Sequence, residues 1–96
     1  MPDIKDTLAL RKSTHGDFRD NAVVAQLFKA ILRDKQIVRM SYYHVEALDA
    51  ICCKIARIIT GDPNHVDSWH DIAGYATLVE NIILEEREPK SNDAAK

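Results

Sequence analysis

The stretch KIARIITGDPNHVDSWHDIAGYATL, residues 54–78, decides the fold of this chain. It contains the end of one apolar helix, a Gly-Asp-Pro-Asn turn at 61–64, and the start of a second helix that opens with carboxylates. Gly61 and Pro63 stop the first helix, because glycine favours a helix C-terminus and proline cannot continue a helix. The sequence therefore predicts two consecutive helices joined by a short turn.

Apolar residues with a helical period predict about four helices in all, and hence an all-α fold. They are expected at residues 3–13, around Ile4, Leu8 and Leu10; at 17–34; at 41–60, with Ser41 as the N-cap; and at 67–86, with Asp67 as the N-cap. The second helix carries its apolar residues along one side, at Val23, Val24, Leu27, Phe28, Ile31 and Leu32. On the third, we expect Leu48, Ile51, Cys52, Ile55, Ile58 and Ile59 to point inward. Residues 35–41 are ambiguous between a loop and a short extended segment.

Composition indicates one helical domain at 1–87 followed by a polar, disordered tail at 88–96. Hydrophobic residues make up 46% and charged residues 29% of the chain, which is typical of globular proteins. The net charge of −2, without a basic block, argues against duplex nucleic acid as a partner. No apolar run approaches the length of about 20 residues that spans a membrane, and no signal peptide is seen. We therefore expect a cytoplasmic protein that does not enter a membrane.

The helix at 67–86 is more apolar than a surface helix requires. Ten apolar residues cover about two-thirds of its circumference, whereas a core-facing stripe is about 100° wide; they are Trp69, Ile72, Ala73, Tyr75, Ala76, Leu78, Val79, Ile82, Ile83 and Leu84. A homodimer that shares this helix accounts for the surplus. The alternative is a central helix enclosed by the other three.

Asp71 lies in line with the apolar residues Tyr75, Leu78 and Ile82 on this helix. An ionised carboxylate among apolar side chains costs several kcal/mol unless it is paired. The nearest cations that precede it in sequence are Lys54 and Arg57, near the end of the preceding helix. Two interpretations are open, a buried ion pair with one of these cations or a ligand role in an anion or metal–phosphate site.

Four other residues are candidate ligands in such a site. Asp67, four residues before Asp71, is a helix cap that can also contact the same cation. Glu46 and Asp49 lie on the polar side of the third helix, either as a solvated face or as further oxygen ligands. Asn21 points to the core side of the second helix, where nothing local explains it. Carboxylate and amide oxygens are ligands that Mg²⁺ accepts, with substrate phosphates completing its octahedron.

Part of this pattern resembles a known family. It is a Lys-x-x-Arg pair near a helix end, followed by an acidic residue, then Asp four residues later, a small residue and Tyr; here these are Lys54, Arg57, Asp67, Asp71, Gly74 and Tyr75. RKSTHGDF, at 11–18, resembles the start of the same proteins. These are small phage and prophage proteins of unknown function, related to the nucleotide-modification-associated domains and through them similar to MazG-like all-α nucleotide pyrophosphohydrolases.

The resemblance implies an oligomeric helical bundle that binds, and hydrolyses, nucleoside triphosphates with Mg²⁺. Asp71 and Asp67 would be the catalytic carboxylates, and Lys54 and Arg57 would neutralise the phosphates. The chain lacks, however, the Glu-Glu-x-x-Glu motif that binds magnesium in catalytic members. Two alternatives therefore stay open, a non-catalytic module that binds a nucleotide or a host or phage protein, and a purely structural helical adaptor.

Overall fold

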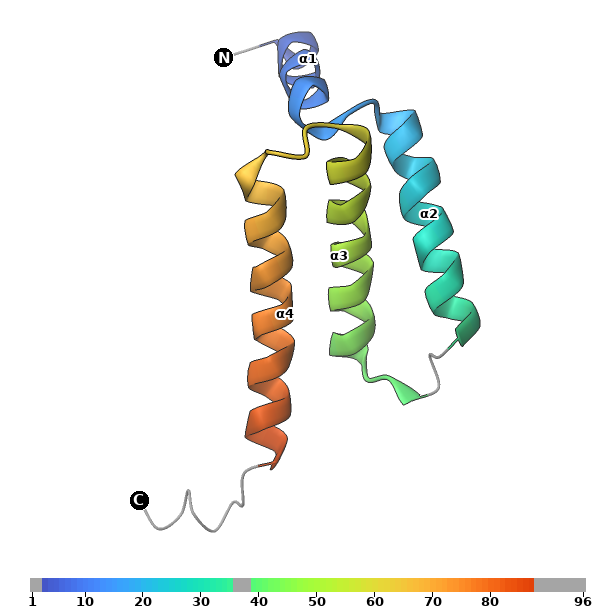
Figure 1. Cartoon of the computed structure of the whole chain (residues 1–96), viewed down its shortest axis with the longest axis vertical. Coiled ribbons are helices and arrows are strands. Elements are labelled where there is room, and N and C mark those ends of the chain that lie inside the picture. The colour runs from blue at the N-terminus through green and yellow to red at the C-terminus, as the bar shows by residue number, and fades with distance from the viewer. Residues whose placement is uncertain (1–2, 36–38, 88–96) are drawn as a thin grey trace.

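Four helices account for nearly all of the described chain (Figure 1). The computed structural model describes residues 3–35 and 39–87, and its helices are α1 (Ile4–His15), α2 (Phe18–Lys35), α3 (Tyr42–Thr60) and α4 (Val66–Arg87). The described residues contain no strand, so the predicted all-α fold is confirmed. The predicted tail at 88–96 and part of the ambiguous segment at 35–41 lie outside the described residues.

The helix ends lie within two residues of the predictions, and two of the differences have a structural reason. α1 continues through His15 and ends at Gly16, whose φ of 82° favours glycine, so the helix ends two residues later than expected. α4 begins at Val66, so Asp67 lies in the first turn and is not the N-cap. Its carboxylate is still favourable there, because the helix dipole is positive at this end. Ser41 precedes α3 as predicted, and its backbone N–H donates to His44 Nδ1 at 3.0 Å.

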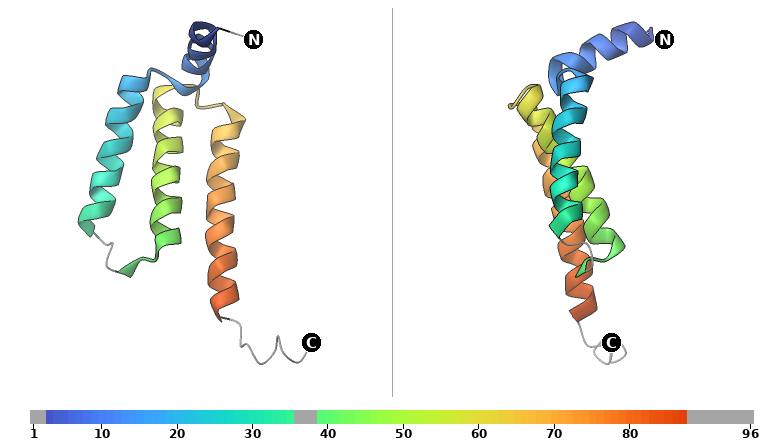
Figure 2. Two further views of the ribbon diagram at one scale, coloured as in Figure 1. Left: turned by 180° about the vertical axis from the view of Figure 1, so that it is seen from behind. Right: turned by 90° about the vertical axis from the view of Figure 1, so that its right-hand side faces the viewer.

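The three long helices form a single layer with α3 in the middle. α3 packs against α2 along one side and against α4 along the other, and α1 crosses near the end of α3 (Figures 1 and 2). At the far end of the α3–α4 pair, the Tyr43 hydroxyl donates to Glu86 Oε1 at 2.9 Å. The bundle expected from the family resemblance is therefore opened out, with α4 flanking α3 instead of being enclosed.

Burial follows from this layer. The buried hydrophobic residues are small, namely Ala25, Ala47, Cys52 and Ala56, and no large side chain among the described residues is fully buried. Leu27 and Ile31, predicted on the apolar side of α2, are 63% and 60% exposed. Ile59, predicted to point inward from α3, is exposed as well, so that prediction is wrong. No helix of the described residues covers that side of the layer.

A backbone contact between two glycines fixes α1 to the end of α3. A Cβ atom on Gly61 would lie 2.5 Å from the His15 carbonyl carbon and 2.6 Å from the Gly16 nitrogen. Beside this contact, the Asp62 N–H donates to the Thr14 carbonyl at 3.0 Å. Only glycine allows the two segments to approach so closely. No helix in the described part of the chain is long and apolar enough to cross a membrane.

We expect Gly61→Ala to lower the free energy of unfolding by more than about 1 kcal/mol, because the added methyl would overlap the His15–Gly16 backbone. Gly74→Ala is the matched control. Nothing lies within 4 Å of a Cβ at Gly74, and removing a glycine from a helix interior stabilises by up to about 1 kcal/mol. Urea unfolding followed by circular dichroism measures both, and equal shifts in the two variants would contradict the proposed contact.

Candidate functional site: a cation-lined pocket between α1, α2 and α3

Lys54 and Arg57, the two residues predicted to bind phosphate, lie in different environments. Lys54 Nζ lies 2.9 Å from Asp71 Oδ2, and the Lys54 side chain is only 17% exposed. The hydrogen bond from Lys54 holds the pKa of Asp71 below its usual value. Of the two interpretations of Asp71, the structure therefore shows the ion pair with Lys54. Arg57, one turn further along α3, makes no such pair among the described residues.

The other predicted metal ligands lie apart from this ion pair. Asp67 has an 83% exposed side chain, 3.9 Å from His65 Nε2, and Glu46 is exposed on α3, where Asp49 is half-buried. The amide of Asn21 donates to the His15 carbonyl at 2.5 Å, which explains its inward orientation. Within residues 3–35 and 39–87, no three His, Cys, Asp or Glu side chains are grouped to hold a metal ion. The Mg²⁺ site stays a prediction.

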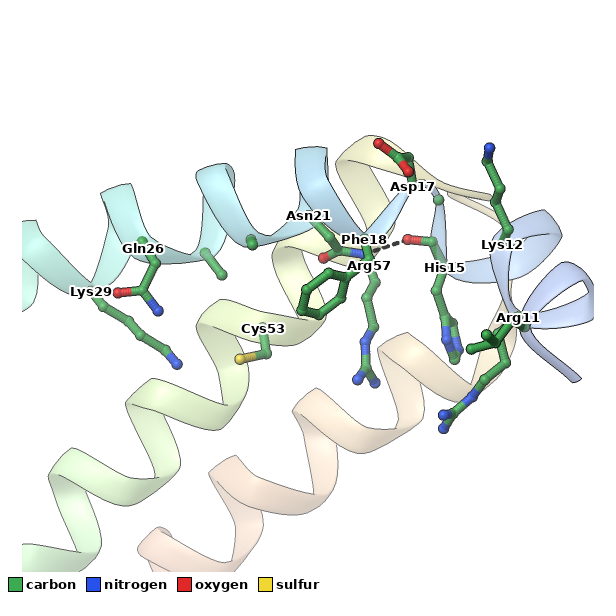
Figure 3. A pocket seen from close by; sticks show the side chains of 14 residues that line it. Arg11, Lys12, His15, Asp17, Phe18, Asn21, Gln26, Lys29, Cys53 and Arg57 are labelled. Carbon is green, nitrogen blue, oxygen red and sulfur yellow. Dashed lines mark hydrogen bonds between the residues drawn. The ribbon is translucent and has the colours of Figure 1, made fainter. Parts of the chain in front are cut away.

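A pocket of about 540 Å³ opens between α1, α2 and α3, and we call it the basic pocket (Figure 3). Its charged lining consists of Arg11, Lys12, Lys29 and Arg57, with Asp17 as the carboxylate and His15 as a further titratable group. The volume is in the range of small-molecule sites, about 300–1,000 Å³. With four cations and one carboxylate among its lining residues, the pocket has a net positive potential.

The cations of the basic pocket are not held in salt bridges in the described part of the chain. Arg11, Lys12, Lys29 and Arg57 form no ion pair there. In Figure 3, Arg11, His15 and Arg57 point the same way although they come from two helices, whereas Lys12 and Asp17 point away from them. Two guanidinium groups thus converge beside an imidazole. Such groups recognise phosphate or carboxylate oxygens with paired hydrogen bonds.

His15 reports the positive potential of this region. Burial lowers its pKa below the usual 6.5, and the positive charges of Arg57, His65, Arg11 and Lys54 lower it further. The His65 ring meets the His15 ring edge-on, with 5.6 Å between the ring centroids. A neutral His15 at pH 7 follows, and a bound anion would reverse the effect of the cations on its pKa.

Phe18 gives the basic pocket an aromatic wall. It is the first residue of α2, lines the pocket beside Ala22, and is 82% exposed. An exposed aromatic ring next to converging cations offers a stacking surface for a flat, anionic molecule. The pocket thus combines charge recognition with an apolar plane.

Sequence reasoning identified Arg57 but missed Arg11, Lys29 and Phe18. Phe18 and Lys29 are eleven residues apart, so a helical wheel places them on one side of α2, and this signal was available. Arg11 carried no such signal. It reaches the pocket only because the Gly16–Gly61 contact places the end of α1 against α3.

The fold and the pocket define a small all-α domain with a cation-lined cavity. A family model described as a domain of unknown function, DUF6378, matches residues 5–83, so the chain belongs to the DUF6378 family. This range includes every residue of the basic pocket. Comparisons with curated proteins and with solved structures gave no match. The family description assigns no activity and gives no link to MazG-like or phage proteins.

We expect Asp71→Asn to lower the stability of the fold at neutral pH, because it leaves the largely buried Lys54 ammonium without its partner. The pKa of Asp71 is lowered in the folded chain, so its contribution is present above the ordinary value of 3.8 and is lost as the pH falls through the folded-state pKa. Urea unfolding over a pH series measures this.

The difference between Asp71→Asn and the wild type should accordingly shrink below pH 3.8. Glu85→Gln serves as the control, because it makes the same carboxylate-to-amide change at an exposed position of the same helix. Its stability should equal that of the wild type. A difference that persists unchanged into acid would show that the ion pair is not its cause.

Proposed function

We propose that this DUF6378 domain binds a phosphate-bearing small molecule, a nucleoside triphosphate, in the basic pocket. The observation that carries the proposal is the convergence of Arg11 and Arg57 beside His15, with neither guanidinium group in a salt bridge among the described residues. Triphosphate oxygens would bind the two guanidinium groups. Phe18 would stack on the base, a contact that contributes about 1–3 kcal/mol in single-stranded nucleic acid complexes.

The resemblance to MazG-like proteins supports the same ligand class, since Arg57 belongs to its Lys-x-x-Arg pair. Hydrolysis with Mg²⁺ is a further step of the proposal. It assigns Asp67 and Asp71 as metal ligands, and it requires oxygens beyond those that one chain brings together, because the described residues contain no metal-binding group of three. Binding, and not hydrolysis, is therefore the function that the geometry supports best.

Isothermal titration with ATP, inorganic triphosphate and adenosine, each with and without Mg²⁺, tests the proposal. We expect both triphosphates to bind and adenosine to bind far more weakly. Arg57→Gln removes charged hydrogen bonds of about 1.5–3 kcal/mol and should weaken ATP binding at least about tenfold. Arg33→Gln removes the same charge from the far end of α2, outside the pocket, and should leave binding unchanged.

The Phe18→Ala variant distinguishes the contribution of the base to the affinity from that of the phosphates. Loss of the stacking contact should weaken ATP binding about tenfold, whereas the affinity for inorganic triphosphate should not change. Absence of binding by either triphosphate at millimolar concentration, or an equal loss in Arg57→Gln and Arg33→Gln, would refute the proposal.

The ligand should also change the titration of His15. In the free chain its pKa is below 6.5, so folding favours the neutral imidazole, and stability falls as the pH drops below 6.5 until the folded-state pKa is passed. Bound phosphates favour the imidazolium and should raise the pKa, so ATP affinity should increase as the pH falls through this range. NMR titration of the His15 ring with and without ATP measures both values. A free pKa at or above 6.5, or no change with ATP, would contradict this arrangement.

The apolar side chains that remain exposed favour a second function, as a helical module that binds another protein. A host or phage protein was the alternative partner considered from the sequence. The arrangement of the apolar residues in the layer, however, points to a more specific occupant.

A further inference from the structure

The layer of α2, α3 and α4 has no core of its own. Its buried hydrophobic residues are three alanines and a cysteine, and no large side chain in residues 3–35 and 39–87 is fully buried. A domain normally places at least two layers of secondary structure around a shared hydrophobic core. A single layer of three helices leaves the second layer to be supplied by something else.

The two sides of the layer differ in polarity. Cys53 and Arg57 of α3 line the basic pocket, and so define the polar side of the layer. Residues two apart on a helix point about 200° apart, so Ile55, which lies between Cys53 and Arg57, points to the opposite side. The same reasoning places Leu27 and Ile31 opposite Lys29, a pocket residue of α2.

The same division holds for α4. Asp71 lies on the polar side, since it pairs with Lys54 and Arg57 is close enough to lower its pKa. Trp69, two residues earlier, therefore points to the other side, and Ala76 and Ile83 follow it at intervals of seven residues. Leu78, seven residues after Asp71, lies on the polar side.

The residues opposite the basic pocket form one continuous surface across all three helices, which we call the apolar face. Its members are Val24, Leu27 and Ile31 of α2, Leu48, Ile51, Ile55 and Ile59 of α3, and Trp69, Ala76 and Ile83 of α4. None is buried, and Leu27, Ile31, Ile59 and Trp69 are between 55% and 63% exposed. α1 does not cover this surface, because it lines the basic pocket on the other side.

We propose that the apolar face is the interface of a homodimer, in which two copies stack face to face and share one core. α2, α3 and α4 have 18, 19 and 22 residues, hence roughly 27–33 Å of length each at about 1.5 Å per residue. With neighbouring helices about 8–10 Å apart, the face covers roughly 700–900 Å². A stable interface buries about 800 Å² per partner, so a second copy supplies the area that is needed.

A second copy also matches the chemistry of the surface. Apolar side chains from all three helices would meet identical side chains across a two-fold axis, and an isologous interface requires only that one patch be complementary to itself. Glu80 lies eleven residues after Trp69 on the same side of α4 and is exposed, so the dimer has to leave its carboxylate in solvent at the rim of the interface. The dimer leaves both basic pockets on its outer sides, so assembly and ligand binding are independent. The earlier expectation of a dimer through the fourth helix is thereby extended to three helices.

Light scattering and thermal unfolding over a range of protein concentrations test the homodimer. The wild type should have twice the mass of the 10.9 kDa chain at tens of micromolar, and its unfolding midpoint should rise with concentration. Leu27→Asp buries an unpaired carboxylate in the interface and should raise the dimer dissociation constant at least about tenfold. Leu78→Asp is the matched control, because Leu78 is 59% exposed and Leu27 is 63% exposed. It should behave as the wild type.

A wild type that stays folded as a single chain at these concentrations, with a midpoint independent of concentration, would overturn the proposal and point to a different protein partner. Dissociation by Leu78→Asp but not by Leu27→Asp would place the interface on the polar side and would also overturn it. If Leu27→Asp fails to fold, the concentration dependence of the wild-type midpoint still decides the question. ATP titration is not part of this test, so failure of the dimer leaves the proposed nucleotide site standing, and the reverse holds as well.

Discussion

The backbone contact between Gly16 and Gly61 determines how the rest of this structure is arranged. The chain bends sharply after α1 and reverses direction after α3, and the two turns touch where side chains would prevent the contact. The Asn21 amide and the Thr60 hydroxyl both donate hydrogen bonds to the His15 carbonyl at this point, so the last carbonyl of α1 has two donors. α1 is thereby held across the end of the layer, and the loop between residues 15 and 18 becomes one wall of the basic pocket.

Local structure followed from the sequence because it depends on local physics. Helical periodicity, Ser41 and the Gly61–Pro63 turn gave the four helices with ends within two residues of those observed. The side-by-side packing of the helices could not be predicted from the sequence. A helical wheel shows which side of α2 is apolar, but it does not show which neighbouring helix covers that side. Leu27 is on the predicted apolar side of α2, yet no helix of the described residues covers it. The sequence predicts more apolar surface on α4 than one small bundle can cover, and α4 does expose apolar side chains. α2 and α3 expose apolar side chains as well.

Only the part of the candidate site that depends on spacing along a single helix could be predicted from the sequence. The sequence identifies Asp71 as a carboxylate in need of a partner, and Lys54, one of the two cations near the end of the preceding helix, is that partner. Arg57 was grouped with Lys54 because they are one turn apart, yet only Arg57 reaches the basic pocket. Arg11 is 46 positions away from Arg57 in sequence, and no spacing rule joins them. Sites assembled from residues of distant segments require the tertiary contact, here a pair of glycines, before they can be seen.

Trp69 gives the molecule a further property. It is the single tryptophan of the chain, and its indole Nε1–H donates to the Pro63 carbonyl at 2.8 Å, so the ring is anchored to the turn that precedes α4. Trp69 as a whole is 55% exposed, on the apolar face. Indole emission moves to shorter wavelength when water is excluded from the ring. The chain therefore carries an intrinsic fluorophore at the edge of that surface, whose emission colour distinguishes a solvent-exposed face from a covered one without any added label.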